Sequence, residues 1–461
     1  MTVDSKQAAY TLVVGLGKTG LSVVRYLRAR GETVIVVDSR DIPPGLRDFK
    51  NEYSDVECHT GKFDASLFVN ARRIVVSPGV ALAEPALVEA SKSNVEIMGD
   101  IDLFSAEVKA PVVAITGSNG KTTVTTLLAL MASQAGLNAV ASGNIGLPVL
   151  DSLDDAIDLY VLELSSFQLE TLQHLPMKAA VVLNVSADHL DRYENVVAYA
   201  KSKQLIYRDA DVLVLNKDDA LASSYQGVGV KAPANNKISF TLAKPQQDEF
   251  GICEAYNDEK EISSQHLCFA ERPLIAIDQL KIKGAHNLQN ALAALALGYA
   301  AGISLDSMIN TLKVFKGLPH RTQFIAEING VNFINDSKAT NVGATRAALV
   351  GLPGKHVLIA GGEAKDADFS ELADVIKKHC RAVVLLGKDA EMIKAVVAGE
   401  IPVELAVDMN AAVKAAQSLA KPGDNVLLAP ACASFDMFDN FEHRGDVFIQ
   451  SVNDLLAEVT S

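Results

Sequence analysis

One Gly-rich stretch constrains the fold of this 461-residue chain more than any other segment, namely Gly117-Ser118-Asn119-Gly120-Lys121-Thr122-Thr123. It follows an apolar run at 111–114 that predicts a buried strand, and it precedes a run at 124–131 that predicts a helix. Such a turn points several backbone N–H groups at one spot, where the helix N-terminus adds partial positive charge. Lys121 adds a full charge, and Thr122 is placed to reach a Mg²⁺ ion on bound phosphates. The segment predicts a nucleoside triphosphate site, although the first glycine of the common pattern would stand at Ile115; the alternative is a tight turn rich in Gly and Thr.

Length and charge limit the class of protein. A chain of 461 residues predicts about three domains. The net charge of −14 argues against a nucleic-acid-binding or anionic-membrane surface. The longest apolar stretch, 291–305, is too short to span a bilayer, and residues 1–6 carry no apolar signal segment. The five cysteines lack metal-site spacing, so we expect reduced thiols, with neither zinc nor a disulfide, in a cytoplasmic protein.

Strand and helix signals alternate in three blocks, which predicts an α/β protein with parallel, doubly wound sheets. The expected domains are 1–98, 99–316 and 317–461. Between about 226 and 279 the pattern weakens. We expect a looser, strand-rich insertion there and assign no chemistry to it.

A second glycine pattern, Gly15-x-Gly17-x-x-Gly20, follows the first predicted strand, and Asp38 ends the next one. This matches the fingerprint of dinucleotide-binding folds, in which glycines let a pyrophosphate approach and an acidic side chain accepts bonds from hydroxyl groups. Either a nicotinamide cofactor or the diphosphate of another nucleotide fits this pattern.

Polar side chains follow three further predicted strands. Glu163 ends one strand and is a natural Mg²⁺ ligand if it faces the phosphate loop; the alternative is a solvated carboxylate. His189 could bind metal or steer a substrate, or be structural. Lys338 offers a positive charge to a phosphoryl group or a carboxylate, beside the hydrogen-bonding groups of Thr340 and Asn341; the alternative is a solvated loop that caps a helix.

Taken in order, these motifs resemble those of the Mur ligase family over nearly the whole chain. The matching segments are Gly15 to Gly20, Ser77-Pro78-Gly79, Thr116 to Thr123, Gly143-Asn144-Ile145-Gly146, Glu163, Asp188 to Tyr193, His286-Asn287, Gly317 to Arg321, Asp336 to Asn341 and Pro430 to Ser434. The Asp336 to Asn341 run is similar to that of the family members that add D-glutamate. Ser118 stands where the family usually has Thr, and Lys18 where an apolar residue is expected beside the uridine.

The resemblance implies a fold and a reaction. The fold has a Rossmann-like UDP-sugar domain, a central P-loop ATPase-like domain and a Rossmann-like C-terminal domain that brings the amino acid. The reaction is the ATP-dependent joining of D-glutamate to UDP-N-acetylmuramoyl-L-alanine (UDP-MurNAc-L-Ala) through an acyl phosphate, a cytoplasmic step of peptidoglycan synthesis, with ATP and two Mg²⁺ ions in a monomer. The rival interpretations are a folylpolyglutamate synthase-like ligase and an ATP-driven switch without ligation.

The resemblance also implies roles for individual residues. The catalytic set is Lys121, Glu163, His189, Lys203 and Lys338, and the metal set is Thr122, Glu163, His189 and Lys203, with Lys203 carbamylated by CO₂. The ATP contacts are Gly117, Ser118, Asn119, Gly120, Lys121, Thr122, Thr123, Asn287, Asn290, Arg321 and Asp336. The UDP-sugar contacts are Lys18, Thr19, Asp38, Ser39, Arg40, Ser77, Gly79, Asn144 and His189, and the D-glutamate contacts are Lys338, Thr340, Lys365, Ser434 and Phe441. The sequence leaves open that Lys203 is an unmodified surface lysine on a helix.

Overall fold

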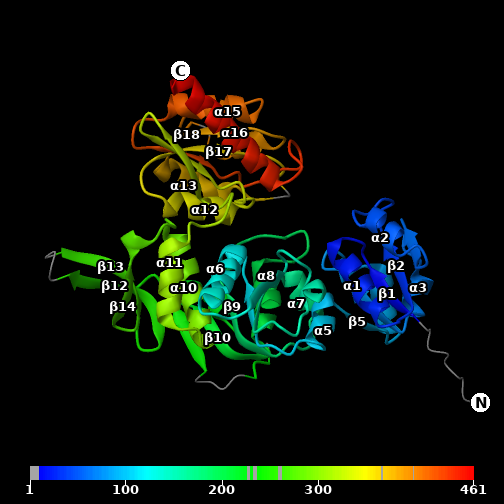
Figure 1. Cartoon of the computed structure of the whole chain (residues 1–461). Coiled ribbons are helices and arrows are strands. Elements are labelled where there is room, and N and C mark those ends of the chain that lie inside the picture. Colours follow the sequence, from blue (N-terminus) through cyan, green and yellow to red (C-terminus); the bar gives the residue numbers. More distant parts are fainter. Residues whose placement is uncertain are drawn as a thin grey trace, which may run out of the picture.

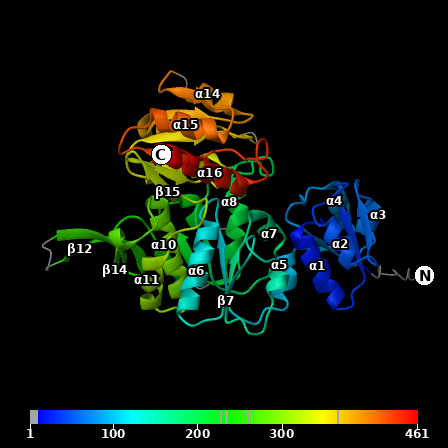
Figure 2. The ribbon, with the colours of Figure 1, turned by 45° about the horizontal axis from the view of Figure 1, so that its top comes forward.

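The computed structural model describes residues 10–225, 229–231, 236–257, 262–364, 367–397 and 399–460. Three sheets follow one another along the chain, each covered by helices (Figure 1). The sheet of the central domain lies between the other two domains in sequence, and the C-terminal domain sits beside it in both views (Figure 2). The α/β, three-domain architecture is as the sequence predicts.

The first domain is a five-stranded parallel sheet in the order β3-β2-β1-β4-β5. Its elements are β1 (Thr11–Val14), α1 (Lys18–Ala29), β2 (Val34–Asp38), α2 (Leu46–Glu52), β3 (Glu57–Thr60), α3 (Ala65–Val69), β4 (Arg73–Val76), α4 (Pro85–Lys92) and β5 (Glu96–Met98). The glycine turn between β1 and α1 is tight, because a Cβ on Gly20 would lie 1.9 Å from the Gly15 carbonyl oxygen. The tight turn expected of the fingerprint glycines is therefore present, and the approach of a pyrophosphate stays a prediction.

The central domain has a nine-stranded sheet in the order β14-β13-β12-β11-β10-β9-β6-β8-β7. Its parallel part holds β6 (Val112–Thr116), β7 (Ala139–Gly143), β8 (Leu159–Glu163), β9 (Met177–Val182), β10 (Ala210–Asn216) and β11 (Lys237–Phe240). The helices are α5 (Asp100–Ser105), α6 (Lys121–Gln134), α7 (Ser166–Thr171), α8 (Val196–Gln204), α9 (Ala220–Ser223), α10 (Ala285–Ala300) and α11 (Leu305–Val314). Apolar clusters cover both faces of the sheet, and α10 is buried continuously from Asn290 to Gly298.

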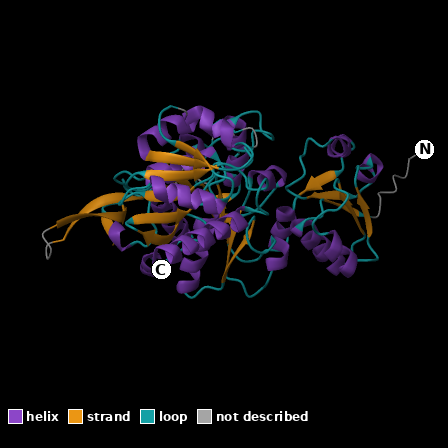
Figure 3. Cartoon of the chain, turned by 90° about the horizontal axis from the view of Figure 1, so that it is seen from above, coloured by secondary structure: helices purple, strands orange, loops and turns teal. Residues whose placement is uncertain are grey.

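The weakly patterned segment at 226–279 is strand-rich, as expected, where the structure describes it. β12 (Glu249–Asn257), β13 (Ile262–Phe269) and β14 (Arg272–Ala276) form an antiparallel extension of the central sheet, and β12 joins β11 in parallel. The extension projects beyond the helices that cover the rest of the sheet (Figures 1 and 3). It is a continuation of the same sheet, and residues 226–228, 232–235 and 258–261 lie outside the described residues.

The prediction of five reduced thiols is wrong for one pair of cysteines. Cys253 on β12 and Cys268 on β13 form a disulfide across 15 residues of sequence. The register pairs Gly251 with Cys268, so Cys253 stands two residues further along, on the same face and diagonal to its partner. Cys58, Cys380 and Cys432 are free. Sequence spacing alone hides this pairing, because it depends on the register of two strands that carry weak periodicity.

The third domain has a six-stranded sheet in the order β15-β16-β20-β17-β18-β19, parallel except for the antiparallel edge strand β15. Its strands are β15 (Gln323–Ile328), β16 (Val331–Asn335), β17 (His356–Ala360), β18 (Cys380–Leu385), β19 (Val403–Leu405) and β20 (Asn425–Leu428). Its helices are α12 (Val342–Gly351), α13 (Ser370–His379), α14 (Ala390–Val397), α15 (Met409–Leu419) and α16 (Phe441–Thr460). No helix in the described ranges is both long enough and apolar enough to cross a membrane.

The first two domains share part of their packing. One buried apolar cluster includes Leu27 of α1, Phe104 of α5 and Tyr160 of β8. An ion pair between Arg25 and Asp151, with 2.7 Å between nitrogen and oxygen, adds a polar contact beside it. The first domain is thus held against the central domain by its first helix.

Candidate functional site

The predicted phosphate loop connects β6 to α6. The loop needs its glycines, since Gly117 has φ +153° and Gly120 has φ +83°, values that side chains disfavour. A Cβ on Gly120 would also lie 2.4 Å from Oδ1 of Asn290, on α10. Because α6 begins at Lys121, its first N–H groups face this loop. The strand, loop and helix expected from the sequence are all present.

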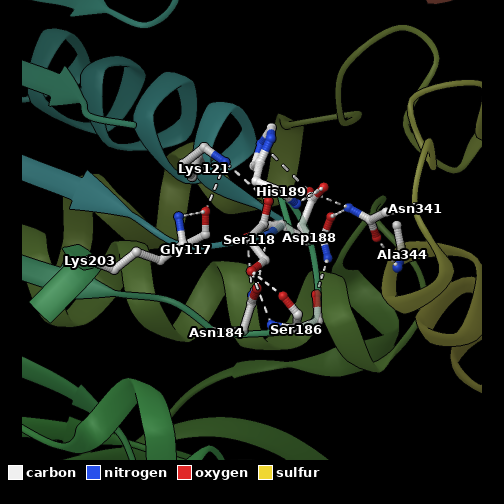
Figure 4. A network of polar contacts seen from close by, with 11 residues as sticks. Gly117, Ser118, Lys121, Asn184, Ser186, Asp188, His189, Lys203, Asn341 and Ala344 are labelled. Carbon is white, nitrogen blue, oxygen red and sulfur yellow. Dashed lines mark hydrogen bonds and ion pairs between the residues drawn. The ribbon is translucent and has the colours of Figure 1, made fainter. Parts of the chain in front are cut away.

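The loop is braced by the residues that follow β9. The Ser118 N–H donates to the Asn184 carbonyl at 2.9 Å, and the Asn119 N–H donates to Oδ1 of Asn184 at 2.8 Å. The Ser118 hydroxyl donates to the Ser186 carbonyl at 3.1 Å and accepts from the Ser186 N–H at 3.0 Å (Figure 4). The departure at position 118 therefore keeps a hydroxyl where the fold uses one.

Two lysines meet at one carbonyl of this loop. Lys121 Nζ donates to the Gly117 carbonyl at 2.8 Å and to the Ser118 carbonyl at 3.0 Å, while Lys203 Nζ donates to the same Gly117 oxygen at 3.0 Å (Figure 4). Burial lowers the pKa of Lys121, although the carboxylates of Glu163 and Asp188 oppose this effect. Two lysine nitrogens thus converge on one carbonyl oxygen of the loop.

Lys203 is not a surface lysine. It projects from α8, is only 1% exposed, and its Nζ lies 4.3 Å from the centre of the Tyr199 ring. Burial lowers the pKa of the Lys203 amine well below its ordinary value, and repulsion from Lys121 lowers it further. A larger share of this amine is therefore neutral, and thus nucleophilic, than in a solvated lysine.

Glu163 faces the phosphate loop, as the metal-ligand interpretation requires. It is 2% exposed, at the end of β8. Its Oε2 accepts from the Thr122 hydroxyl at 2.8 Å, and its Oε1 accepts from Asn144 Nδ2 at 3.0 Å. The alternative of a solvated strand-end carboxylate is excluded by this burial. Thr123, the next residue of the loop, is buried as well.

His189 stands beside the two lysines in an unusual backbone conformation, with φ +54°. Its ring contacts those of Phe167 and Tyr199, with centroid distances of 5.0 and 6.0 Å, while 44% of the side chain remains exposed. Partial burial lowers the pKa of His189. The Asp188 carboxylate raises this pKa, and the Lys203 side chain lowers it further. The ring is thus favoured in its neutral form, the form that ligates metals.

The predicted nucleotide contacts come from two domains. Asn287 and Asn290 lie at the start of α10, where Asn290 Nδ2 donates to Oδ1 of Asn287 at 3.3 Å. Arg321 leaves a buried Nε without a hydrogen-bond partner among the described residues. Burial raises the pKa of Asp336 to about 7, against bonds from Thr322 and the charge of Arg321. Unpaired buried donors are rare in proteins, so the Arg321 guanidinium is suited to a polar ligand.

The predicted amino-acid contacts gather where the strands of the third domain end. Lys338 Nζ lies 4.0 Å from the centre of the Phe441 ring. Although Lys338 is accessible to solvent, desolvation lowers its pKa to about 8, and the charges of Arg321 and Lys121 add to this effect. Ser434 is buried and Thr340 is half-buried, while Lys365 lies outside the described residues.

Arg444 is a residue of this region that sequence reasoning missed. It is only 2% exposed and bonds the Ser337 hydroxyl at 3.0 Å, the Ser337 carbonyl at 2.8 Å and the Cys432 carbonyl at 3.1 Å. It therefore ties the loop of Lys338 to the loop of Ser434. Arg444 lies in the first turn of α16, and its charge gave no signal of burial in the sequence, since only the tertiary fold brings both loops to it.

The predicted UDP-sugar contacts of the first domain lie at the carboxyl ends of β1, β2 and β4. Asp38 is buried; its carboxylate accepts from the Leu16 N–H at 2.7 Å and from Arg40 at 2.6 and 2.9 Å. Desolvation of Asp38 is outweighed by these bonds, so its pKa is lowered. The Ser77 hydroxyl donates to the Gly15 carbonyl at 3.2 Å. Asp38 therefore organises the turn and orients Arg40.

The other predicted contacts of this group divide between two domains. Lys18 and Thr19 open α1, Ser39 and Gly79 lie in the adjoining turns, and Asn144 lies beside Glu163 in the central domain. In the described part of the chain, no hydrogen bond joins the first-domain group to the phosphate loop. The structure thus brings the loops of the predicted ATP and amino-acid sets into contact, through the hydrogen bonds of Asn341 to Asn119 and Asp188, and leaves the first-domain set at its own sheet edge.

Comparisons with known proteins agree with this arrangement. Three family descriptions match successive parts of the chain: Mur ligase MurD-like, N-terminal domain, at 9–99; Mur ligase middle domain, at 115–298; and Mur ligase, glutamate ligase domain, at 320–432. The chain is 48% identical over 450 residues to the UDP-N-acetylmuramoylalanine–D-glutamate ligase of Pseudomonas aeruginosa, covering 97% of this chain and 98% of that protein. The ligase of the same name from Nitrosococcus oceani is 48% identical over 453 residues, with 98% of both chains covered.

Solved structures show the same fold. The MurF ligase of Thermotoga maritima, in complex with ADP, aligns with a TM-score of 0.61 at 17% identity, covering 98% of this chain and 99% of that one. A MurC ligase from the same organism aligns with a TM-score of 0.58 at 18% identity, covering 96% and 99%. With three matched domains and relatives at 48% identity over nearly the whole length, the chain belongs to the Mur ligase family.

Proposed function

We propose that this Mur ligase joins D-glutamate to UDP-MurNAc-L-Ala at the expense of ATP, in the cytoplasm and as a monomer. A contact between two loops of the structure supports this proposal independently of the names of the relatives. The Asp336 to Asn341 loop, which holds Lys338, contacts the phosphate loop directly, since Asn341 Nδ2 lies 3.4 Å from Oδ1 of Asn119. A phosphate donor and an amino acid bound on these two loops would therefore meet where the two loops touch.

The reaction follows from the chemistry of the two substrates. An oxygen of the L-alanine carboxylate attacks the γ-phosphorus of ATP, the bond to the bridging oxygen breaks, and ADP leaves. The D-glutamate amine then attacks the acyl carbon, loses a proton, and displaces inorganic phosphate as the amide forms. Both steps bring anions together, so Lys121 and Arg321 would stabilise charge on the phosphates. Lys338 would hold the D-glutamate, together with Thr340, Lys365, Ser434 and Phe441.

The remaining predicted contacts complete the assignment. Gly117, Ser118, Asn119, Gly120, Thr122, Thr123, Asn287, Asn290 and Asp336 would hold ATP, and Lys18, Thr19, Asp38, Ser39, Arg40, Ser77, Gly79, Asn144 and His189 would hold the UDP-sugar. Because Asp38 is occupied by Leu16 and Arg40, its contribution would be made through Arg40.

The residues around Glu163 fit Mg²⁺. The Thr122 hydroxyl and the Glu163 carboxylate, oxygen donors of the kind that Mg²⁺ prefers, lie 2.8 Å apart. Thr122, Glu163 and His189 would hold the ions, with Lys203 as a fourth ligand once carbamylated. Within the described ranges no three His, Cys, Asp or Glu side chains gather as a metal-binding group, so the set relies on the hydroxyl and on the carbamate. Bound Mg²⁺ supplies positive charge to the phosphate oxygens.

Carbamylation of Lys203 is supported by its surroundings. The Nζ lone pair attacks the carbon of CO₂, one proton leaves the nitrogen, and an anionic carbamate replaces the amine. The depressed pKa favours the neutral amine that this step needs, and the neighbouring Lys121 charge would stabilise the product.

Phosphate release from ATP tests the function. We expect release with UDP-MurNAc-L-Ala and D-glutamate together, and little with L-glutamate or D-aspartate, because inversion or shortening moves the amine or the distal carboxylate off its partners. The Lys121→Ala variant should fold normally and release almost none. Equal rates with and without D-glutamate, with no amide product, would support the ATP-driven switch instead.

A further inference from the structure

We infer that Asn341 and Gly343, at the start of α12, form a docking contact through which the phosphate loop positions the third domain for amide formation. The contact consists of these two residues and their partners Asn119, Ser186 and Asp188 in the central domain. Asn341 and Gly343 act as positioning residues in the ligase reaction. The inference rests on the function proposed above.

Asn341 uses both ends of its amide. Its Oδ1 accepts from the Ala344 N–H at 2.8 Å and so caps α12. Its Nδ2 donates to Asp188 Oδ2 at 3.1 Å and to Asn119 Oδ1 at 3.4 Å, across 153 and 222 residues of sequence (Figure 4). A helix cap needs only an oxygen acceptor, which aspartate or serine would also supply. The interdomain hydrogen bonds are therefore what requires an amide nitrogen at position 341.

Gly343 lets the backbone of α12 approach the central domain closely. A Cβ at this position would lie 2.7 Å from both Cβ and Oγ of Ser186, closer than carbon atoms approach in proteins. The glycine does not have positive φ, so the helix itself accepts alanine, and alanine is the better helix former. Its small size therefore serves the contact rather than the helix.

The partners of the contact belong to the bracing of the phosphate loop. Ser186 exchanges two hydrogen bonds with Ser118, and its hydroxyl accepts from Nδ2 of Asn119 at 3.4 Å. Phosphate bound by the loop would fix Ser118 and Asn119, and with them the surface on which α12 docks. Docking in turn would place Lys338, three residues before Asn341, over the acyl phosphate. The binding of ATP and the binding of D-glutamate would then be coupled reciprocally, because a contact made only when the domains are closed strengthens the binding of both ligands.

The Asn341→Asp variant separates docking from capping. Aspartate caps a helix as well as asparagine does, but its carboxylate would face that of Asp188 and repel it. We expect an unchanged melting temperature, a KM for D-glutamate raised on the order of tenfold, and more than one ADP released per amide formed, because water reaches the acyl phosphate. Adding Asp188→Asn to this variant restores a donor–acceptor pair and should lower the ADP-to-amide ratio again.

A second pair of variants tests the close approach. Gly343→Ala should stabilise α12 slightly yet raise the number of ADP molecules released per amide formed. Adding Ser186→Gly, which removes both clashing atoms, should return this number towards one. If Asn341→Asp and Gly343→Ala both keep the wild-type KM and one ADP per amide, the docking contact is wrong. If the wild-type protein forms no amide at all, the proposed function is wrong, and the two failures are thereby distinguished.

Discussion

At the scale of single residues, Lys203 is the most informative, because a buried amine beside a second cation is costly to charge. Its 1% exposure and its bond to the Gly117 carbonyl place it where an anion would be stabilised by Lys121. A carbamate at this position would convert repulsion between the two side chains into attraction.

We predict that Lys203→Ala loses most ligase activity and regains part of it when acetate or another small carboxylate is added. The diffusible anion would replace the carboxylate part of the carbamate. Lys203→Arg is the matched control, since it keeps the cation, cannot be carbamylated, and leaves no cavity for acetate. Phosphate release at increasing acetate checks this, and rescue by amines instead of acids would contradict it.

We predict that the KM for D-glutamate rises as pH increases through about 8, where Lys338 titrates. Below that pH the ammonium is charged and attracts a carboxylate, and above it the neutral amine does not. In Lys338→Arg the charge persists to higher pH, so the rise should disappear even if the maximal rate falls. Initial rates at several D-glutamate concentrations between pH 7 and 9.5 measure this; identical pH profiles for both proteins would exclude Lys338 from the amino-acid site.

At the scale of elements, α16 joins the two loops of the proposed amino-acid site through one buried charge. Arg444 donates to the Ser337 hydroxyl and to the carbonyls of Ser337 and Cys432. Removing its side chain therefore leaves buried acceptors on two loops without a hydrogen-bond donor. We predict that Arg444→Met lowers the free energy of unfolding by about 3 kcal/mol. It should also weaken D-glutamate binding, while ATP binding to the phosphate loop is kept.

Urea unfolding with Arg346→Met as the control checks this prediction. Arg346 is exposed on α12, so its replacement should change stability by no more than about 0.5 kcal/mol. Equal stability of both variants would show that the Arg444 bonds contribute nothing net.

Elements with strong local signals were predictable from the sequence, and elements defined by their neighbours were not. β6, the phosphate loop and α6 follow from an apolar run, two glycines and a helical run, so residues 111–131 are as predicted. β14 and β15 are antiparallel edge strands whose pairing is set by partners already in place, and neither shows a clear period of its own. The Cys253–Cys268 pair has the same origin, since register rather than spacing brings the two sulfurs together.

At the scale of the whole molecule, two of the three site groups meet and the third stands apart. The sequence identifies Lys121 and Lys338 as candidates but cannot show that their loops touch, because Asn341 and Asn119 are 222 residues apart. It also left Lys203 open as a surface lysine, since burial is a property of the assembled domain. Such long-range contacts carry no local signal in a single chain.

We predict that the molecule changes its dimensions when ligands bind. The amino-acid loops lie on a separate domain from the phosphate loop, and most of the predicted UDP-sugar contacts lie on a third, so we expect the domains to move relative to one another as substrates bind. Small-angle scattering should give a smaller radius of gyration with an ATP analogue and UDP-MurNAc-L-Ala than without ligands. The Lys121→Ala variant, which should bind the analogue poorly, serves as control. Equal radii for the wild type in both conditions would contradict this domain motion.

If the third domain docks as inferred above, the hydrogen bonds that Asn341 makes to the central domain would also break once in every cycle, before ADP and the new peptide diffuse away. Their strength is therefore a compromise between residence time and release. The Asn341 NH₂ group donates to two acceptors, at 3.1 and 3.4 Å, so the bonds are of moderate length. A substitution that tightened them would protect the intermediate better and still yield a slower enzyme, because the exit of product would then limit the number of turnovers per second.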